Sequence, residues 1–143
     1  WKTPAGGGTT DYAVDIYYKA IEDGKYTSFL SEGTYLPMLY MDDAIDAIVE
    51  LMSADPKQLG EFKSYNLGGL SFAPEDLAAE IKKYIPNFTL DYAPDFRQAI
   101  ADTWPSSIDD SVAKADWGYQ PKFDIDRMTT TMLDNLKVKL AKA

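Results

Sequence analysis

The sequence predicts an α/β fold in which short strands alternate with helices. Apolar residues recur at helical spacing in several segments, and strand-like segments lie between them. The strands are short and few, whereas a doubly wound sheet gathers about five or six parallel strands around a phosphate-binding turn. We therefore expect this chain to supply one or two strands of a larger parallel sheet, together with a helical cap over it.

The N-terminal segment is a loop followed by an amphipathic helix. Residues 1–9 are rich in Gly and Pro, which predicts a loop. A helix is expected from Thr10 or Asp11, and Gly24 should end it. Its buried stripe at i, i+3, i+4, i+7 and i+8 consists of Ala13, Ile16, Tyr17, Ala20 and Ile21.

Two strands and a second helix come next. Residues 26–30 alternate as a strand does, a turn is expected at 32–34, and residues 36–41 form a second strand. Pro37 places that strand near a sheet edge or at a strand start. Asp42 or Asp43 should cap the following helix. That helix carries one apolar face made of Ile45, Ile48, Val49 and Met52.

The central part predicts a strand, a helix and another strand. Residues 62–67 have strand character and lead into two glycines. Ser71 is a plausible N-cap for the helix that follows, with Pro74 in its first turn. Pro86 should stop this helix, and residues 88–92 form a short strand. The predicted stripe of the helix is Leu77, Ala78, Ile81 and Ile85.

The C-terminal third is predicted to be helical. Pro94 opens a helix that runs to about Asp102, and a short helix starts at Ser107 or Asp109. A turn-rich linker at 117–121 precedes the last helix, which Asp124 or Asp126 should cap. The expected order is therefore α-β-β-α-β-α-β-α-α-α. The inward residues of the last helix are Ile125, Met128, Met132, Leu136 and Leu140.

Composition excludes several classes of function. The net charge of −9 argues against nucleic-acid binding, because phosphate contacts need a basic face. The chain has no Cys and no His, so disulfides, Cys/His zinc sites and Ser-His-Asp triads are excluded. No apolar run approaches the ~18–20 residues that span a bilayer. We expect a cytoplasmic protein, or a mitochondrial-matrix one in a eukaryote.

The chain lacks two motifs of dinucleotide-dependent oxidoreductases. None of its glycines follows the spacing that lets the backbone approach a pyrophosphate at a helix N-terminus. None of its tyrosines has a Lys four residues later, the spacing at which an ammonium lowers the pKa of a phenol. We therefore predict no catalytic residue and no metal site in this chain.

The glycine run before the first helix is the best local candidate for ligand binding. Free amides of residues 6–8 and the positive end of the helix dipole meet there, beside the hydroxyls of Thr9 and Thr10. A small anion such as an amino-acid carboxylate would fit. The alternative is a flexible loop with an ordinary N-cap.

Two other features have structural and functional interpretations. Packing in a core or interface is the favoured interpretation of Trp104 and Trp117, and the functional alternative for Trp104 is the wall of an apolar pocket. The acidic residues at the start of the second helix are best explained as a cap plus a solvated face, since the loop spacing of a calcium site is absent. These acidic residues are Asp42, Asp43, Asp46 and Glu50.

Five stretches together resemble the L-threonine 3-dehydrogenases of the extended short-chain dehydrogenase type, relatives of the UDP-galactose epimerases. The resemblance covers nearly the whole chain, in order, and matches the C-terminal half of that family. GGGTTDYAV and IADTWPSSIDDS are specific to this group. The stretches are GGGTTDYAVDIYYKA (6–20), LPMLYMDDAIDA (36–47), SYNLGGLSFAPEDLAAEI (64–81), RQAIADTWPSSIDDS (97–111) and DWGYQPKFDID (116–126).

The resemblance implies that residues 1–143 are a substrate-binding domain that closes over an N-terminal Rossmann domain. That domain would hold NAD and the catalytic residues, and this chain would complete its sheet through the strand at 62–67. The implied reaction is hydride transfer from L-threonine to NAD⁺, giving 2-amino-3-ketobutyrate, by an enzyme that is a homodimer when intact. Gly8, Thr9 and Thr10 match the family's substrate loop, and Trp104 matches the Trp that covers the substrate.

Two other functions stay open at this point. One is the C-terminal domain of a nucleotide-sugar epimerase or dehydratase, which few basic residues near the glycine run disfavour. The other is a non-catalytic interaction module. The chain opens at Trp1 rather than Met and moves quickly into a glycine run, so we expect a piece of a longer protein that is inactive by itself.

Overall fold

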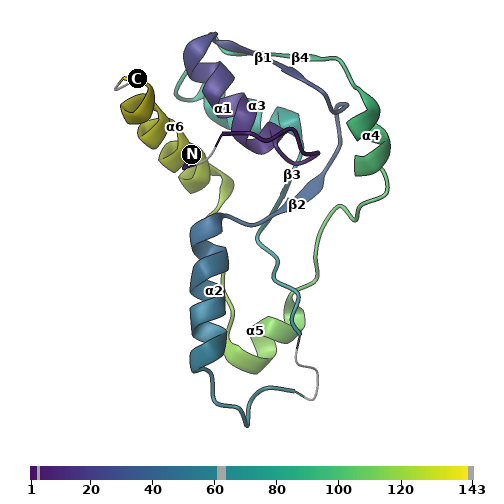
Figure 1. Cartoon of the computed structure of the whole chain (residues 1–143), viewed down its shortest axis with the longest axis vertical. Helices are drawn as coiled ribbons and strands as arrows, with labels where there is room; N and C mark the ends of the chain where they lie inside the picture. Colours follow the sequence, from purple (N-terminus) through teal and green to yellow (C-terminus); the bar gives the residue numbers. More distant parts are fainter. Residues whose placement is uncertain (3, 61–63, 142–143) are drawn as a thin grey trace.

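The computed structural model describes residues 1–2, 4–60 and 64–141, and its elements follow the predicted order. The fold is α/β, with a small parallel sheet of two strands (Figure 1). Two regions are visible: a larger body that contains most of the elements, and a narrower arm that extends away from it. No helix in the described part of the chain is long and apolar enough to cross a bilayer.

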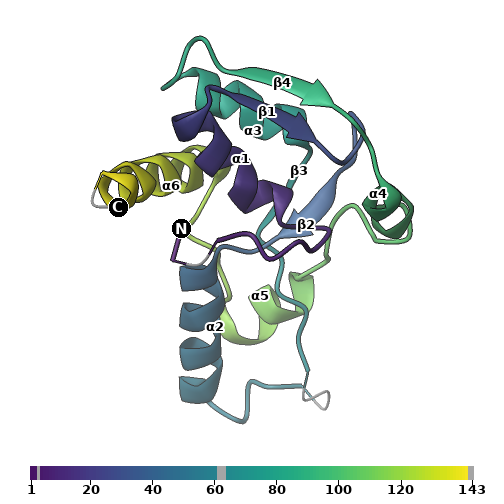
Figure 2. The same ribbon diagram turned by 45° about the horizontal axis from the view of Figure 1, so that its top comes forward.

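The body contains two pairs of strands (Figure 2). β1 (Lys25–Ser28) and β4 (Thr89–Tyr92) are parallel and pair residue by residue from their first to their last positions. β2 (Leu36–Met38) and β3 (Leu70–Phe72) are antiparallel. Since β2 and β3 do not join the parallel pair, the described chain has two small sheets rather than one continuous sheet.

Three helices pack around the main core of the body. They are α1 (Tyr12–Glu22), α3 (Pro74–Lys82) and α6 (Ile125–Leu140), and α6 contacts both of the others. Each helix has a completely buried residue: Ile16 in α1, Leu77 in α3 and Leu136 in α6. The stripes predicted for these helices therefore lie where expected, with their edge positions partly exposed.

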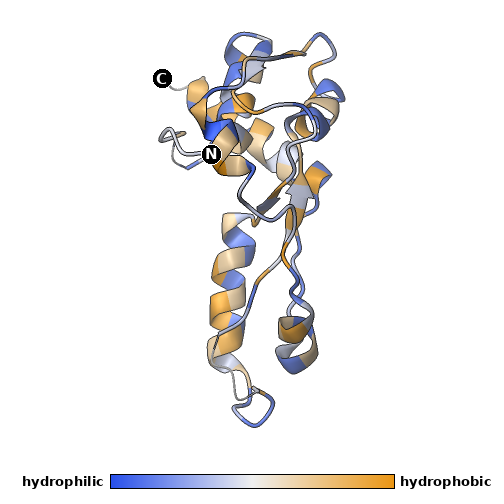
Figure 3. Cartoon of the chain, turned by 90° about the vertical axis from the view of Figure 1, so that its right-hand side faces the viewer, coloured by the Kyte–Doolittle hydropathy of each residue, from blue (hydrophilic) through white to orange (hydrophobic). Residues whose placement is uncertain are grey.

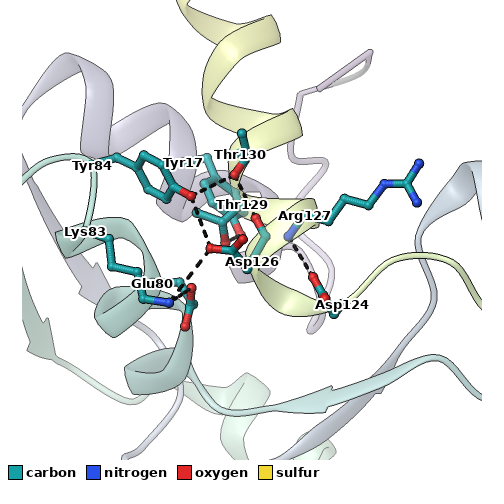
Figure 4. A network of polar contacts seen from close by, with 9 residues as sticks. All are labelled: Tyr17, Glu80, Lys83, Tyr84, Asp124, Asp126, Arg127, Thr129 and Thr130. Atoms are coloured by element: carbon teal, nitrogen blue, oxygen red, sulfur yellow. Dashed lines mark hydrogen bonds and ion pairs between the residues drawn. The ribbon is translucent and has the colours of Figure 1, made fainter.

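Polar side chains link α1 and α3 to α6 (Figure 4). The hydroxyl of Tyr84, just after α3, donates to Asp126 Oδ1 at 3.1 Å and lies 2.9 Å from Thr130 Oγ1. The buried hydroxyl of Tyr17 on α1 lies 2.9 Å from Thr129 Oγ1 on α6. These contacts give α6 a fixed register against its neighbours, in addition to the apolar packing.

The arm consists of α2 (Met41–Ser53), the segment 64–69 and α5 (Ser111–Trp117) with Tyr119 after it (Figure 3). Its own core is small: Ala47, Ala113 and Tyr119 are buried, with Tyr65, Leu67 and Trp117 partly buried around them. The Tyr119 hydroxyl donates to the carbonyl of Gly68, and Gly118 ends α5 in the left-handed region at φ 76°. Polar contacts and turns therefore carry much of the arm's organisation.

The prediction for α2 was wrong at the start of the helix. The helix begins at Met41, so the preceding strand ends at residue 38 rather than 41, and neither Asp42 nor Asp43 caps it. The face predicted to be apolar is present but open to solvent, whereas Asp43 and Ala47 are the buried residues of the helix. The four side chains of that face, Ile45, Ile48, Val49 and Met52, are each about half exposed or more.

The strand predicted at 62–67 is also not found. Residues 62 and 63 lie outside the described residues, and residues 64–67 have no regular structure. The strand forms later, at 70–72, where β2 offers an antiparallel partner. Ser71 therefore lies within β3, and Ala73 precedes α3, with the Asp76 carboxylate accepting its N–H at 2.9 Å.

The remaining helix starts follow their capping residues. Asp95 accepts from the N–H of Arg97 at the start of α4 (Phe96–Ala101), and Asp124 accepts from that of Arg127 in α6. α5 starts later than predicted, with Asp110 at its N-cap position, and it runs on to Trp117.

Candidate functional site

The glycine loop before α1 holds a carboxylate of its own chain. The amides of Gly6 and Gly8 donate to Asp11 Oδ2 at 2.6 and 2.8 Å. Gly7 between them has φ 99°, a conformation that favours glycine. The anion that was expected at these two amides is therefore already present as the side chain of Asp11. A substrate carboxylate would have to displace it or bind beside it.

The two threonines of the loop differ in their environment. Thr9 is 9% exposed and belongs to the buried polar residues, whereas Thr10 is half-buried and lines a cavity of about 370 Å³. The walls of this cavity come from the loop, α1, the β2–α2 connection and α6. Besides Thr10, the lining residues with polar groups are Trp1, Asp11, Tyr40 and an exposed pair, Lys2 and Asp42, that lie 3.6 Å apart.

Trp104 lies on a different cavity. It is 44% exposed and contributes to an open, polar hollow of about 700 Å³ together with Thr34, Ser71 and Gln98. Phe72, the neighbour of Ser71 on β3, lines the cavity of Thr10 instead. The two cavities have no lining residue in common. Gly8, Thr9 and Thr10 are consecutive in the loop, and Trp104 lines a different cavity from that of Thr10.

A third cavity of about 260 Å³ adjoins both of these. It shares Met38 with the cavity of Thr10, and Ser71 and Ser107 with the hollow of Trp104. Its cation, Lys114, lies 2.7 Å from the carboxylate of Asp110. The three cavities form a continuous series around β2 and β3, and the basic groups in their linings lie close to acidic ones.

The tyrosines of this chain are poor candidates for a catalytic base. Burial raises the pKa of Tyr12 and Tyr17 well above the ordinary value, and that of Tyr119 to about 12. Such phenols keep their protons at neutral pH and act as donors, as Tyr12 does toward the carbonyl of Phe72 at 3.0 Å. The pKa is also raised for Tyr26, Tyr35, Tyr40, Tyr65 and Tyr92.

The acidic residues at the start of α2 have separate structural roles. The buried carboxylate of Asp43 accepts the N–H groups of Lys122 and Phe123, both at 3.0 Å. The exposed carboxylates of Asp46 and Glu50 lie 2.6 and 3.7 Å from the ammonium of Lys122. The expectation of a solvated face holds for these two, but Asp43 is an internal anchor. The described residues include no cluster that could hold a metal ion.

The glycines of the arm do not provide a site for a dinucleotide. A Cβ on Gly69 would lie 2.8 Å from the carbonyl oxygen of Met38, and one on Gly68 would lie 3.0 Å from the Asp110 carboxylate. Close packing within this chain therefore explains both glycines. Together with the missing glycine fingerprint, this means that the residues present do not fit NAD, although that cofactor belongs to the family that the sequence resembles.

Sequence reasoning missed two features of the site. The first is the occupation of the glycine amides by Asp11, for which the available signal was a carboxylate three residues after a glycine. The second is the connection from Met38 to Tyr40, which lines the cavity of Thr10. That connection was read as the end of a strand, and only the early start of α2 reveals it as a cavity wall.

Comparison with known proteins gives relatives of more than twice the length of this chain. No protein-family model matches. An uncharacterised epimerase/dehydratase of Staphylococcus aureus is 53% identical over 135 residues, which are 94% of this chain and 42% of the relative. The chain thus spans less than half the length of the curated relatives that it matches.

Solved structures give the same coverage. L-threonine dehydrogenase from Phytophthora infestans superposes with a TM-score of 0.93 at 49% identity, over 96% of this chain and 45% of the other. The holo form of a GalE-like L-threonine dehydrogenase from Cupriavidus necator gives 0.90 at 54% identity, over 94% of this chain and 44% of the other. The resemblance read from the sequence is confirmed. The chain belongs to the extended short-chain dehydrogenase family that includes the L-threonine 3-dehydrogenases, and it matches their C-terminal half.

Proposed function

We propose that residues 1–143 are the substrate-binding domain of an NAD-dependent L-threonine 3-dehydrogenase. The enzyme would oxidise L-threonine to 2-amino-3-ketobutyrate. The observation that carries this proposal is the match to solved L-threonine dehydrogenases at 48–54% identity over 94–97% of the chain. At such identity the side chains that line a small pocket are expected to be similar as well as the backbone.

Within this domain we assign the substrate contacts to the glycine loop. Thr10 lines the cavity of about 370 Å³, and its hydroxyl would hydrogen-bond the carboxylate or ammonium of the amino acid. Gly8 and the buried Thr9 would hold the loop in shape, with Asp11 bound to the amide of Gly8. This arrangement suits a small, polar substrate at the edge of an apolar cavity.

Trp104 would cover the bound substrate. The exposure of Trp104 supports this role. Its indole is not packed into either core, so it is free to form a wall of a pocket that a second domain completes. In that position it would exclude water and favour a small substrate. Trp104→Ala should then reduce turnover far more than it reduces stability.

NAD would be bound by an N-terminal Rossmann half, and this chain would be inactive without it. The raised pKa values of the buried tyrosines Tyr12 and Tyr17 support this division, because a hydroxyl substrate needs a base that these phenols do not offer. We further propose that the intact enzyme is a homodimer.

A chimera tests the proposal. Residues 1–143 would replace the matched part of the Cupriavidus necator enzyme, and NADH formation would be followed with L-threonine and NAD⁺. Threonine-dependent reduction at a rate comparable with the parent enzyme is expected. A folded chimera that binds NAD⁺ but reduces it no faster with threonine than without would refute the proposed substrate.

The second candidate is a nucleotide-sugar epimerase or dehydratase, which the name of the Staphylococcus aureus relatives favours. A diphosphate needs cations, yet Lys114 is paired with Asp110, and the hollow of Trp104 has acidic but no basic residues in its lining. Calorimetry of the chimera with a UDP-sugar separates the two functions. Binding at micromolar concentration would favour the epimerase reading.

A further inference from the structure

Trp104 lies on a turn that depends on contacts from other parts of the body. α4 ends at Ala101, and the N–H of Trp104 donates to the carbonyl of Ala101 at 3.0 Å. Residues 105–110 then belong to no helix or strand. The position of Trp104 is therefore set by the side chains that hold this turn on either side of the indole.

Gln98 on α4 holds the turn on its N-terminal side. The Gln98 Oε1 accepts the N–H of Ser31 at 2.7 Å, and the Gln98 Nε2 donates to Asp102 Oδ1 at 2.6 Å. The same Nε2 donates to Thr34 Oγ1 at 3.2 Å. One partly buried amide, which can donate and accept at once, thus joins the turn between β1 and β2 to the residue that lies two positions before Trp104.

Ser71 on β3 holds the turn on its C-terminal side. The Ser71 hydroxyl donates to the carbonyl of Ser106, two positions after Trp104. Ser71 is itself fixed by the antiparallel pairing of β3 with β2, where it lies opposite Pro37. Gln98, Ser71 and Ser106 also line the same hollow as Trp104. The two contacts therefore bracket the indole at the wall of one cavity.

The indole itself is held by little else within the chain. Trp104 is 44% exposed and belongs to neither core. A side chain that closes over a ligand loses conformational freedom, and binding is weakened by that loss unless the segment is already ordered. A turn that is fixed at residues 102 and 106 would present Trp104 with much of this ordering already complete.

We propose that Gln98 is a positioning residue, which holds the turn in the place from which Trp104 covers the bound amino acid, with Ser71 as a second and weaker tie. This inference rests on the proposed function. It extends the substrate site to two side chains that act through Trp104 and not by contact with the substrate.

A double-mutant cycle in the chimera with the Cupriavidus necator N-terminal part tests the proposal. Gln98→Ala should lower kcat/KM for L-threonine by roughly fivefold or more, and Ser71→Ala by roughly twofold, because Trp104 is no longer held in place. In a Trp104→Ala background, Gln98→Ala should lower kcat/KM by less than about twofold, since the residue it acts through is gone. A merely structural role would give equal losses in both backgrounds.

Gln120→Ala is the matched control. Gln120 is exposed and lines none of the three cavities around β2 and β3, so this substitution should leave kcat/KM unchanged. An unchanged kcat/KM in Gln98→Ala, or equal losses with and without Trp104, would overturn the proposal.

Fluorine NMR follows Trp104 without relying on activity. The 143-residue chain has three tryptophans, so labelling with 5-fluorotryptophan gives three signals, and Trp104→Phe identifies that of residue 104. Gln98→Ala should change the chemical shift of the Trp104 signal and leave those of Trp1 and Trp117 in place. A Trp104 signal that does not respond to Gln98→Ala would contradict the positioning role.

Gln98→Glu keeps the test decisive where Gln98→Ala does not fold. Its carboxylate still accepts the N–H of Ser31, but it cannot donate to Asp102 and faces that carboxylate instead. The Trp104 signal should therefore change in this variant too, and an unchanged signal would overturn the proposal.

The two readouts separate this inference from the proposed function. A parent chimera that does not oxidise threonine would refute the proposed function, while the fluorine signals would still show whether Gln98 positions Trp104. An active chimera whose kcat/KM is insensitive to Gln98→Ala would refute this inference alone.

Discussion

The body and the arm differ in how much of their apolar surface is buried. The body buries side chains from α1, α3, α6 and both strand pairs in one large cluster, and several of them are completely buried. The arm has three buried apolar residues of its own, and the largest apolar residues of its longest helix are exposed. The body is therefore stabilised by its own core, whereas in the arm the largest apolar side chains are exposed in the described chain.

The largest expected effect is in the body. Leu77 on α3 is completely buried in the main core, so Leu77→Ala should lower the free energy of unfolding by about 2–5 kcal/mol. Denaturant unfolding of the 143-residue chain measures this loss. A change below about 1 kcal/mol would mean that the body is not the stable part of the molecule, and the contrast between the two regions would fail.

The next effect is at the joint between the two regions. Asp43→Ala removes the acceptor of two backbone N–H groups, those of Lys122 and Phe123, and should cost about 2–3 kcal/mol. Asp42→Ala is the control, because Asp42 is exposed and its pair with Lys2 is on the surface; it should change stability by less than about 0.5 kcal/mol. Similar losses for both variants would show that Asp43 is not an anchor.

Substitutions of two tyrosines should have smaller effects on the free energy of unfolding, and they differ between the arm and the body. Tyr119→Phe in the arm removes a hydrogen bond to the carbonyl of Gly68 and should cost about 1 kcal/mol. Tyr26 in the body is 4% exposed, and its hydroxyl has no partner within the described chain, so Tyr26→Phe should be neutral or slightly stabilising. The opposite ranking in urea unfolding would contradict the assignment of these contacts.

The smallest change in stability is expected for a substitution on the exposed apolar face of α2 in the isolated chain. Met52 is 82% exposed, and Met52→Gln should therefore change the free energy of unfolding by less than about 0.5 kcal/mol. The same unfolding assay measures it. A loss of more than about 1 kcal/mol would indicate that the apolar face of α2 already packs against other residues in the chain alone.

The parts of the fold that the sequence predicted are those whose partners lie within the chain. The stripes of α1, α3 and α6 reach the body core, and Asp124 caps α6 as expected. The predictions at 62–67 and for α2 were made from local pattern alone, since alternation and apolar spacing indicate a strand or a helix face but not its neighbour. Where no neighbour is present, the segment 64–67 stays irregular and the α2 face stays open.

The candidate site was likewise predictable only where it is local in the sequence. The loop of Gly8, Thr9 and Thr10 is local, so its place at the start of α1 could be read from the sequence. Its details could not, because the difference between buried Thr9 and cavity-lining Thr10 depends on the packing of α6 and the β2–α2 connection. Trp104 shows the limit most clearly: whether it lines the same cavity as Thr10 depends on tertiary packing, which no spacing in the sequence reveals.

The most direct test of the substrate assignment is the KM for L-threonine of the chimera with Thr10→Ala. The account predicts a rise of about tenfold or more, with the KM for NAD⁺ unchanged, because Thr10 would contact only the amino acid. Thr103→Ala is the control, since the exposed Thr103 hydroxyl donates to the carbonyl of Ile100 and lines none of the three cavities described. An unchanged KM for L-threonine in the Thr10 variant, in a chimera that remains active, would contradict the assignment.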